Sequence, residues 1–383
     1  MRISHIIDSL DPLQGGPPVS TVSLAAAQAA LGHDVTVVSN DFSDPDLRLN
    51  KLLGHIPGSD RLTFEFILHK NFLERFFSSR AKRFFNRNIH RWDMLHLHGV
   101  WSPILWSAAN CALTKNVKWG IAPRGMLHPW ALEQKPWKKR LALRCGWRRL
   151  LRRAAFLHVL NAEEQAYVGQ QFPGCPIEII PNGVFPGEVN YSTSDFFVSS
   201  RMARLKGRAY ILFLGRLHHV KGLDYLAEAF AKVAHVHPDV DLVVAGADAG
   251  MRKPFLMQVS RLGISNRVHV AGAIFGADKY AVLRNALCLC HPSRQEGFSM
   301  SIIEALASGL PVVISEGCHF GEVEEQGAGK VVELHANSIA NALLEIVNDN
   351  EWRKNAGKKA RELALAKYTW PKLAEHSINI YEK

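Results

Sequence analysis

The chain has 383 residues, of which 47% are hydrophobic and 21% are charged, and its formal net charge is +11. This length exceeds what one ordinary hydrophobic core accommodates, so two domains are expected, and the composition excludes a solvated tail as the main feature. No apolar run reaches the roughly 18 residues that a membrane-spanning helix requires. Asp8 stands where a signal peptide would need its apolar region, so no signal peptide is expected.

The six cysteines are scattered and form no Cys-x-x-Cys motif: Cys111, Cys145, Cys175, Cys288, Cys290 and Cys318. We interpret them as reduced core thiols of a cytosolic protein.

The positive charge is unevenly distributed. Residues 135–153 contain nine basic residues and no acid. A second basic cluster consists of Arg75, Arg80, Lys82, Arg83, Arg87 and Arg91. A run of like charge is usually a solvated face, but a basic surface can also bind nucleic acid, anionic lipid or a phosphorylated partner.

The first half of the chain begins with a strand–loop–helix–strand pattern. An apolar run at 1–8 predicts a strand, the Gly/Pro-rich segment 11–20 a loop, and 22–31 a helix that stops at Gly32. A second strand is predicted at 34–39, and this arrangement calls for a parallel sheet. Further strand-like runs that end in turn residues lie at 93–99, 118–123, 156–160 and 177–183.

The same pattern restarts near Arg208. Strands are predicted at 208–217, 240–246, 267–272, 286–293 and 310–315, with helices between them, the first at 223–236. Strands that alternate with helices twice over predict an α/β protein with two doubly wound, Rossmann-like domains. We place the N-terminal domain at 1–185, a linker at 186–206, the C-terminal domain at 207–367, and a final helix within 368–383 that carries Pro371 in its first turn.

Ligands bind at the carboxyl edge of doubly wound sheets, so the loops that follow the strands are candidate sites. These loops are 14–19, 98–101, 123–126, 215–222 and 293–301. If the two sheets face each other, the loops line one cleft.

Two cations flank the first strand of the second half. Arg216 follows Gly215 directly, and Lys221 precedes Gly222. A planar guanidinium and a mobile ammonium suit a diphosphate. The alternative is a surface loop with two ordinary cations.

The segment EGFSMSIIE, residues 296–304, combines a glycine-bearing turn with a helix start. Gly297 allows close approach of a ligand, Ser299 or Ser301 suits a helix cap, and the unpaired N–H groups of the first turn suit a phosphate. Glu296 lies outside the helix and reaches sugar hydroxyls in this interpretation, while Glu304 accepts hydrogen bonds from a ribose diol. The alternative for Glu304 is an acid on the helix surface.

The segment EGFSMSIIEALASGLPVVIS, residues 296–315, resembles the E-x7-E element of retaining, GT-B-fold glycosyltransferases of the GT4 family. The resemblance extends to GRLHHVKGLDYL, QGGPP, IIPNGV and YTWPKLAEHSINIY, and so covers nearly the whole chain. It implies a GT-B fold, with two Rossmann-like domains facing across a cleft. The N-terminal domain would bind the acceptor, the C-terminal domain would bind the nucleotide sugar, and 368–383 would pack back on the N-terminal domain.

The resemblance also implies roles for individual residues. Arg216 and Lys221 would bind the donor diphosphate and stabilise the charge that develops on it. His98 would face the donor sugar near the reacting carbon, and Glu296 would bind that sugar. The implied catalytic residues are thus Arg216, Lys221, Glu296 and His98, and the donor-binding residues are Gly15, Gly16, Gly297, Phe298, Ser299, Met300 and Glu304.

Two positions depart from the family pattern. Arg124 stands near a position where many relatives have histidine, and it either contacts an acceptor phosphate or forms a structural ion pair. The segment 315–326 lacks the common Gly-Gly turn near residue 320, which leaves the donor or acceptor detail there open.

A metal site is not expected. His96 and His98 would share one face of a strand and suggest a metal, but no nearby acid or cysteine completes the set, and no D-x-D motif is present. We therefore expect a metal-independent enzyme without a cofactor.

The basic stretch 130–153 contains Trp130, Trp137 and Trp147 together with leucines. Aromatic rings next to cations suit an anionic membrane interface. The alternative is a helix packed inside the domain with a charged outer face.

The expected function is the retaining transfer of a hexose from a GDP- or UDP-linked donor to a glycan or a polyprenyl-phosphate-linked acceptor. Cell-envelope polysaccharide, exopolysaccharide or lipopolysaccharide assembly is the expected setting, in the cytoplasm and peripherally on the inner face of the plasma membrane. No nucleic acid partner is expected. The alternatives are a nucleotide-sugar epimerase of the same fold and a basic nucleic-acid-binding protein.

Overall fold

The computed structural model describes residues 1–11, 14–41, 53–54, 56–68, 78–134, 136–190, 205 and 207–383. The chain forms two compact units. Unit 1 consists of Met1–Pro181 with Trp370–Lys383, and unit 2 of Asn182–Thr369. Most of the predicted linker 186–206 lies outside the described residues.

Unit 1 is built on a parallel seven-stranded sheet in its described part. In spatial order the strands are β3 (Thr63–Leu68), β2 (Asp34–Asp41), β1 (Arg2–Ile7), β4 (Met94–His98), β5 (Lys118–Ala122), β6 (Phe156–Val159) and β7 (Ile177–Ile179). All of these strands except β3 correspond to a strand expected from the sequence. The central strands are buried on both faces and therefore read as short, nearly continuous apolar runs.

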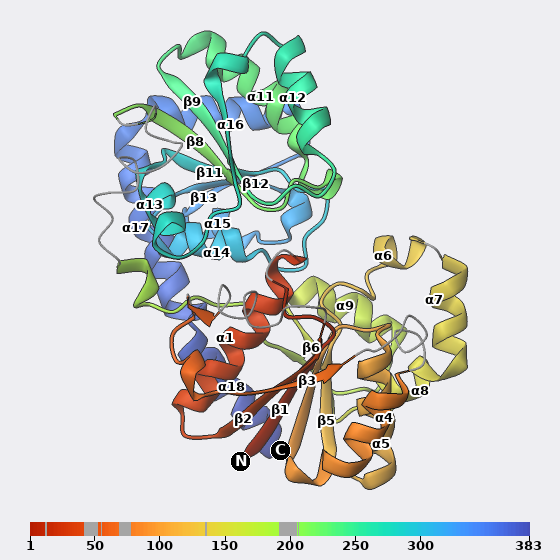
Figure 1. The fold of residues 1–383 in the computed structure, drawn as a ribbon. Coiled ribbons are helices and arrows are strands. Elements are labelled where there is room, and N and C mark those ends of the chain that lie inside the picture. The colour runs from red at the N-terminus through yellow and green to blue at the C-terminus, as the bar shows by residue number, and fades with distance from the viewer. Residues whose placement is uncertain are drawn as a thin grey trace. The chain divides into compact units, whose positions relative to one another are not determined.

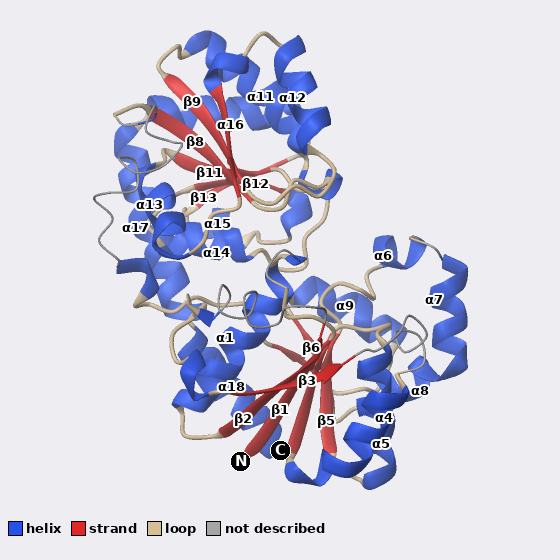
Figure 2. Ribbon diagram, in the orientation of Figure 1, coloured by secondary structure: helices blue, strands red, loops and turns tan. Residues whose placement is uncertain are grey.

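Helices cover both faces of this sheet (Figures 1 and 2). α1 (Gly16–Ala30) and α18 (Trp370–Glu382) lie on one side, and α4 (Ser79–Asn88), α5 (Pro103–Lys115) and α8 (Arg148–Arg153) on the other. The remaining helices of unit 1 are α6 (Pro129–Glu133), α7 (Pro136–Ala142) and α9 (Ala162–Gln171). Single helical turns lie at Ser59–Arg61, Ile89–Arg91 and Leu143–Trp147.

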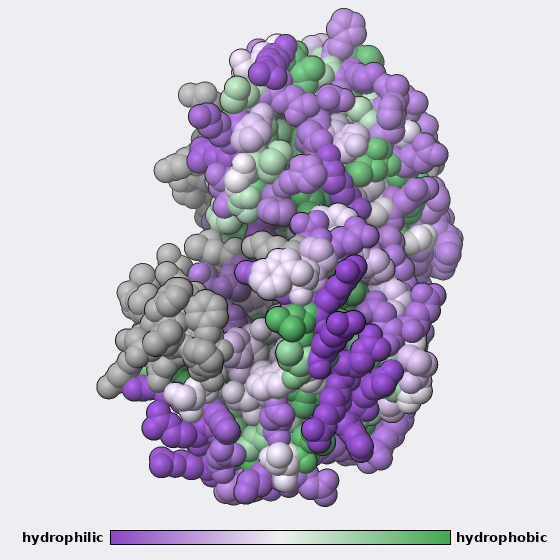
Figure 3. Space-filling model, turned by 90° about the vertical axis from the view of Figure 1, so that its right-hand side faces the viewer, coloured by the Kyte–Doolittle hydropathy of each residue, from purple (hydrophilic) through white to green (hydrophobic). Residues whose placement is uncertain are grey.

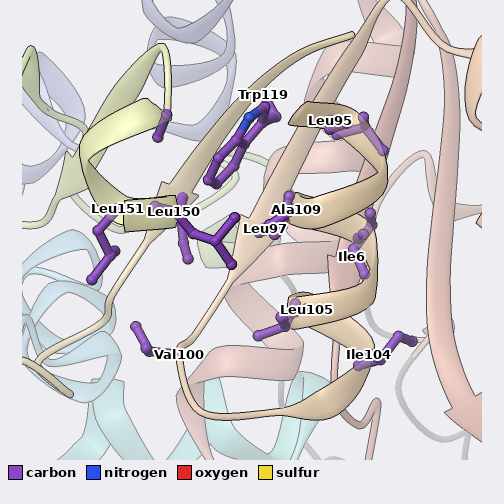
Figure 4. Close-up of a cluster of buried hydrophobic side chains, with 14 of the residues drawn as sticks. Ile6, Leu95, Leu97, Val100, Ile104, Leu105, Ala109, Trp119, Leu150 and Leu151 are labelled. Atoms are coloured by element: carbon purple, nitrogen blue, oxygen red, sulfur yellow. The ribbon is translucent and has the colours of Figure 1, made fainter. Parts of the chain in front are cut away.

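The core on the α5 side shows how the sequence pattern becomes packing. Leu105 and Ala109 of α5 pack against the sheet beside Leu97 of β4 and Trp119 of β5, as Figure 4 shows. Each of these side chains is at most 3% exposed. Burial of apolar surface on this scale holds the helix to the sheet and fixes the direction of the strand ends.

The last helix closes unit 1 although it lies at the far end of the chain. α18 begins at Trp370, with Pro371 as its second residue, and packs on α1. Lys118 Nζ donates a hydrogen bond of 2.7 Å to the carbonyl oxygen of Tyr381. The sequence placed the start of this segment two residues earlier, at 368.

Unit 2 repeats the plan with a parallel six-stranded sheet. Its strands, in spatial order, are β10 (Val268–Gly272), β9 (Val240–Ala245), β8 (Ala209–Leu214), β11 (Cys288–His291), β12 (Val312–Ser315) and β13 (Gly329–Val332). β13 was not expected from the sequence.

The helices of unit 2 form two groups around the sheet. α11 (Leu223–Val236) packs on α12 (Arg252–Arg261) and α16 (Ala336–Asn348), while α14 (Met300–Ala307) packs on α13 (Gly276–Asn285) and α17 (Asn350–Lys367). The short α15 (Glu322–Glu325) precedes β13. Single helical turns lie at Glu188–Asn190, His219–Lys221, Ser265–Arg267 and Glu316–Cys318.

Among the described residues, no helix has the length and apolarity needed to cross a membrane. All six cysteines are free thiols. Four of them are buried, but Cys145 is exposed and Cys175 is half-buried. The expectation of core thiols is therefore wrong for Cys145, which lies in the turn Leu143–Trp147 that follows α7.

Candidate functional site

Each sheet has one point at which the strand order reverses. In unit 1 this point lies between β1 and β4, and in unit 2 it lies between β8 and β11. Loops that leave such a switch point diverge and open a crevice at the carboxyl edge, which is where doubly wound sheets bind ligands. The predicted residues His98, Arg216 and Glu296 all belong to strands or loops at these two points.

In unit 2 the loop after β8 and the loop after β11 are packed tightly together. Gly222 has a φ of 66°, and a Cβ at this position would lie 1.9 Å from the carbonyl oxygen of Pro292. Arg294 joins the loops as well, because its N–H donates to the Val220 carbonyl (2.7 Å) and its guanidinium binds Asp224 at 2.9 and 2.5 Å. Gly222 is therefore required by both its backbone conformation and the close approach.

Glu296 lies at the centre of this loop pair, and one of its oxygens collects three donors. Oε1 accepts hydrogen bonds from His291 Nε2 (2.9 Å) and Ser293 Oγ (2.5 Å), and it also binds the ammonium of Lys221. The Glu296 side chain is only 10% exposed. The sequence predicted Lys221 and Glu296 as separate contacts for phosphate and sugar, and the structure brings them into direct contact.

The donors decide the charge of Glu296. Burial opposes ionisation, but Lys221 and His291 more than offset it and hold the pKa of this carboxyl well below its usual range. Burial also lowers the pKa of His291, which therefore donates from a neutral ring. Glu296 is thus a buried, fully ionised acid whose charge is balanced by Lys221.

Arg216 differs from Lys221 in its surroundings. It is exposed, and among the described residues its guanidinium forms no hydrogen bond or ion pair. Both cations lie in the loop that follows β8, but only Arg216 can bind a ligand without breaking an existing contact.

The helix that follows Glu296 begins at Met300, with Ser299 at the N-cap position. The Ser299 side chain makes no capping hydrogen bond, and its Oγ lies 3.5 Å from His291 Nε2. Ser301 lies inside the helix. The prediction of a serine side-chain cap is therefore wrong, and the first turn of α14 has no serine oxygen bound to its N–H groups.

Phe298 is turned away from the loop surface. Its ring is 8% exposed and packs with Phe320 and Tyr368, at centroid distances of 5.0 and 5.4 Å. Its carbonyl oxygen accepts a hydrogen bond of 2.8 Å from Asn182 Nδ2. Gly297 has no side chain and the Phe298 ring is buried, so a ligand contact at these two residues would come from the backbone.

Glu304 lies on α14 and is 7% exposed, so it is not a surface acid. Its Oε1 accepts a hydrogen bond of 2.7 Å from Lys279 Nζ of α13. Glu188 lies nearby, and its own burial, together with the charge of Glu304 and despite the opposing effect of Lys279, raises its pKa to about 7. The sequence offered no signal for Lys279 or Glu188 as neighbours of Glu304.

The segment 315–326 makes its turn without a Gly-Gly pair. His319 adopts a φ of 51°, and a Cβ on Gly317 would lie 2.5 Å from the Arg294 carbonyl oxygen. Glu296 N donates to the Gly317 carbonyl at 2.8 Å. This segment therefore supports the Glu296 loop through its backbone.

In unit 1, His98 ends β4 at the switch point and is 3% exposed. Its Nε2 lies 2.8 Å from His5 Nδ1, and its Nδ1 lies 2.8 Å from Arg124 Nη2. Both ring nitrogens are thus engaged within unit 1. Burial, together with the neighbouring His96 and Arg124, lowers the pKa of His98 well below its usual value, so the ring is neutral.

Arg124 follows β5 and points into unit 1. Besides His98, its guanidinium donates to Ser20 Oγ (2.7 Å) and Thr21 Oγ1 (3.3 Å) of α1. Burial lowers the pKa of Arg124 to about 10, partly opposed by Glu164, so it remains charged. Its φ of 53° is unusual for a residue with a Cβ, and its Nε is buried without a hydrogen-bond partner in the described structure.

The structure adds a third histidine to the pair that the sequence considered for a metal. His5, His96 and His98 bring one nitrogen each to within 4.8 Å of one another. His5 lies on β1, paired opposite His96 of β4. The sequence could not join them, because strand pairing, not spacing, makes them neighbours.

Gly15 and Gly16 lie at the start of α1. Gly15 precedes the helix with a φ of 94°, Gly16 is its first residue, and no side chain caps this end. Their position at the carboxyl end of β1 agrees with a loop beside the switch point.

The basic stretch 130–153 divides into two parts. Trp147, Leu150 and Leu151 are buried in the core of unit 1, where Figure 4 shows Leu150 and Leu151. Trp137 and Leu141 of α7 are instead 65% and 54% exposed. The prediction of one membrane-facing stretch is therefore wrong for α8, whose apolar side chains pack inward.

Two family models match the chain. The model described as "Glycosyl transferase 4-like domain" matches residues 15–183, and that described as "Glycosyl transferases group 1" matches residues 199–363. A curated relative, the phosphatidyl-myo-inositol mannosyltransferase of Mycobacterium tuberculosis, is 31% identical over 216 residues, which are 53% of each chain. The matched segments span about half the length of the curated relatives.

Solved structures match the whole chain. A sucrose-phosphate synthase from Thermosynechococcus elongatus has a TM-score of 0.79 at 20% identity and covers 100% of this chain and 98% of that one. Anabaena HepE in complex with UDP and glucose has a TM-score of 0.80 at 19% identity and covers 99% and 98%. These likenesses concern the fold.

The two family models lie one on each half of the chain, and the fold is that of GT-B glycosyltransferases. The predicted family and fold class are both confirmed. The chain belongs to the GT4-like glycosyltransferases.

Proposed function

We propose that this protein transfers a hexose from a nucleoside-diphosphate sugar to a glycan or lipid-linked acceptor, with retention of the anomeric configuration. The observation that carries the proposal is the loop pair at the switch point between β8 and β11. There an exposed Arg216, the ammonium of Lys221 and the start of α14 lie on adjacent loops. Cations and helix N-terminal N–H groups are the partners that a diphosphate requires.

The proposed donor is a UDP- or GDP-linked hexose. Anabaena HepE has been solved with UDP-glucose, and several curated relatives are named mannosyltransferases. Glu304, held by Lys279, is the proposed acceptor of the ribose hydrogen bonds.

The electrostatics favour stabilisation of the leaving group. Negative charge grows on the diphosphate as the sugar–phosphate bond breaks, and preorganised cations lower the barrier by meeting that charge. Arg216, together with the Lys221 ammonium that is paired with Glu296, supplies cationic partners for the diphosphate without a metal ion, so we propose that the reaction needs none. Turnover should then persist in EDTA, and abolition by EDTA with recovery on adding Mg²⁺ or Mn²⁺ would contradict this part.

Glu296 is poorly suited to attack the sugar. Three hydrogen-bond donors hold its Oε1. Burial alone would raise the pKa of the Glu296 carboxyl, but Lys221 and His291 lower it by more, and a carboxylate with a low pKa is a weak nucleophile. We therefore propose front-face substitution, in which the departing phosphate helps to take the acceptor proton and Glu296 binds the sugar hydroxyls.

The test of this mechanism is Glu296→Gln with product stereochemistry determined by NMR. Measurable transfer with the donor's anomeric configuration retained is expected. A glycosyl group trapped on Glu296, or an inverted product, would overturn the assignment.

The proposed acceptor carries a phosphate or lipid, and Arg124 and α7 of unit 1 are its proposed contacts, while His98 is proposed to face the donor sugar near the reacting carbon. Figure 3 looks onto the side of unit 1 where α6 and α7 lie in Figure 1, and it shows a small hydrophobic patch bordered by hydrophilic side chains. Exposed Trp137 and Leu141 beside Lys138 and Arg140 suit the headgroup region of an anionic membrane. We propose that α7 rests on the inner face of the plasma membrane during envelope-glycan synthesis.

The decisive experiment is a panel of nucleotide sugars screened by thermal shift, followed by an assay for free nucleoside diphosphate. Release that requires a lipid or sugar acceptor supports the proposal. Conversion of the donor without an acceptor would indicate an epimerase, and stabilisation by nucleic acid alone would indicate a nucleic-acid-binding protein.

A further inference from the structure

Four buried histidines of unit 1 form two hydrogen-bonded pairs. His5 and His98 are joined at 2.8 Å, and His96 and His158 at 3.0 Å. Each ring is at most 3% exposed, and burial lowers the pKa of all four below the usual value. A neutral imidazole has one N–H donor and one acceptor nitrogen, so each hydrogen bond of a ring constrains the other.

The first pair takes its direction from Arg124. A guanidinium only donates, so His98 Nδ1 must accept from Arg124 and His98 Nε2 must carry the proton. His98 Nε2 then donates to His5 Nδ1, which leaves the proton of His5 on Nε2. His5 Nε2 donates in turn to the Gln28 side-chain oxygen at 2.7 Å. The amide nitrogen of Gln28 therefore points the other way.

The second pair takes its direction from a backbone carbonyl. The oxygen of Ile180 only accepts, so His158 Nε2 carries the proton and donates to it at 2.6 Å. His158 Nδ1 then accepts from His96 Nε2, and His96 Nδ1 accepts from the Tyr381 hydroxyl at 2.5 Å. Because the hydroxyl proton of Tyr381 is used in this bond, Tyr381 Oη is left to accept.

The two pairs meet at Gln28 of α1 and Tyr381 of α18. Gln28 Nε2 donates to Tyr381 Oη at 3.1 Å and to Ser377 Oγ at 2.7 Å. The orientation of Gln28 derived from Arg124 and that derived from Ile180 are the same, although the two derivations use different residues. Only one arrangement of protons satisfies the whole chain of hydrogen bonds with four neutral rings.

A metal ion is a weaker explanation of this cluster. A tetrahedral zinc ion bonds nitrogens at about 2.0–2.1 Å, which separates its ligand atoms by more than the 2.8 Å between His5 and His98. The charged Arg124 guanidinium also lies 2.8 Å from His98 Nδ1, where it would repel a cation. Every nitrogen of the three clustered rings already has a hydrogen-bond partner that matches it.

We propose that Gln28 and Tyr381 are positioning residues, which join the two histidine pairs and, through His5, hold the His98 ring in the orientation in which its Nδ1 accepts from Arg124. The orientation of Arg124 at the carboxyl edge of the unit 1 sheet then depends on the last helix of the chain. The functional consequence rests on the proposed function, since it assigns His98 to the donor sugar and Arg124 to the acceptor.

The protonation pattern can be measured without any activity. Two-bond ¹H–¹⁵N NMR spectra of histidine-labelled protein distinguish the two neutral tautomers and the imidazolium ion. We expect the Nε2–H tautomer for all four buried rings at neutral pH, with signals assigned by single His→Gln variants. An Nδ1–H tautomer or an imidazolium at His5 or His98, or signals that shift on adding Zn²⁺ or EDTA, would overturn the proposal.

Two hydroxyl deletions on α18 test the positioning role. Tyr381→Phe interrupts the chain, whereas Ser377→Ala removes a hydroxyl that accepts from Gln28 and donates to the Ala374 carbonyl, leaves the bond from Gln28 to Tyr381 Oη in place, and is the matched control. We expect Tyr381→Phe to alter the His98 signals and to lower kcat roughly tenfold, the effect typical of losing an orienting partner. Ser377→Ala should leave the His98 signals and kcat close to those of the unmodified protein.

Gln28→Glu is a second variant in case Tyr381→Phe does not fold, because a carboxylate cannot donate to Tyr381. Folded variants of both kinds with unchanged His98 signals and unchanged kcat would refute the positioning role while leaving the proposed function intact. The expected tautomers in a protein that transfers no sugar from any donor would instead refute the proposed function alone.

Discussion

The two switch points occupy equivalent places in their sheets but bury polar groups in different ways. At the unit 1 switch point, His5 and His98 belong to a chain of neutral rings whose only charged member is Arg124 at its end. At the unit 2 switch point, Glu296 is ionised and carries Lys221 as its counterion. Buried polar groups cost little when their hydrogen bonds are satisfied, and most polar atoms of both arrangements meet this condition, with Arg124 Nε as an exception in unit 1.

The difference indicates a division of roles. A network of neutral hydrogen-bonded rings fixes the orientation of its side chains but produces only a weak electrostatic field. The ion pair in unit 2, together with the exposed Arg216, provides charged groups that can bind a diphosphate. We therefore associate the unit 2 switch point with the developing charge of the donor diphosphate, and the unit 1 switch point with the orientation of the donor sugar by His98 and of the acceptor by Arg124.

The largest expected effect concerns the two cations of unit 2. Arg216→Ala and Lys221→Ala should each lower kcat on the order of 10²–10³-fold, because each removes a charge that stabilises the leaving diphosphate. Steady-state kinetics measures this, and Lys253→Ala, an exposed lysine of α12, is the control.

The same variants should differ in stability. Lys221→Ala leaves Glu296 buried without its counterion and should cost about 3–5 kcal/mol of unfolding free energy, whereas Arg216→Ala removes no existing contact. Chemical denaturation separates the two. Near-normal turnover in both variants, or equal stability losses, would contradict the assignment.

The next largest expected effect is that lowering the pH destabilises unit 1 before unit 2. Folded-state pKa values of the unit 1 histidines lie below the unfolded value near 6.5, at about 4 for His5 and about 3 for His158. The unfolded chain therefore takes up protons first, and stability falls as the pH drops below about 6.5, by roughly 1.4 kcal/mol per pH unit for each histidine.

Unit 2 should respond later to acid. Burial would raise the pKa of the Glu296 carboxyl, but Lys221 and His291 lower it by more, so this carboxyl stabilises the folded state. That stability is lost only when the pH falls below the unfolded-state pKa of the carboxyl, near 4.5. His291 is the single fully buried histidine at its switch point. Hydrogen exchange at pH 7 and 5.5, corrected for intrinsic rates, should show greater loss of protection in β1 and β4 than in β8 and β11. Equal losses would refute this prediction.

A smaller effect is expected at Glu304. Lys279→Ala leaves the Glu304 carboxylate buried without its cation, and we expect the donor KM to rise roughly tenfold with little change in kcat. Donor-dependence of the initial rate measures both constants. A fall in kcat at unchanged KM would show that Glu304 does not serve ground-state donor binding.

Glu188→Gln sharpens this test. Burial and the charge of Glu304 raise the pKa of Glu188 to about 7, although Lys279 opposes this shift. Above that pH, an ionised Glu188 therefore competes with Glu304 for the Lys279 ammonium. The donor KM should rise above pH 7 in the unmodified protein and stay flat in the Gln variant.

The smallest effect concerns α7. Trp137→Ala combined with Leu141→Ala should weaken binding to phosphatidylglycerol vesicles roughly tenfold, because it removes the exposed apolar side chains of this helix. Sedimentation with vesicles measures the binding, and Val236→Ala, which removes an exposed apolar side chain of unit 2, is the control. Unchanged binding in the double variant would assign the basic stretch to a solvated face.

The neighbours of the predicted site residues were largely out of reach of the sequence. Glu296 and Glu304 stood in a recognisable segment, but nothing in the sequence indicated that His291 and Ser293 would contact Glu296 or that Lys279 would contact Glu304. A signal did exist in unit 1, where His5, His96 and His158 interrupt apolar strand segments. A buried polar side chain in such a run requires a partner, although the run does not say which one.

The amino-acid order alone determined the alternation of strands and helices and the loops that carry Arg216, Glu296 and His98, because periodicity and turn residues are local properties. The family was indicated by the resemblance of whole segments such as 296–315. Tertiary structure decided which side chains meet. Strand order set His5 beside His98, and the return of α18 to unit 1 placed Tyr381 between Gln28 and His96. Tertiary packing also decided that the apolar side chains of α8 are buried whereas those of α7 are exposed. The sequence could not show this difference, because a basic stretch with tryptophans has the same pattern in both cases.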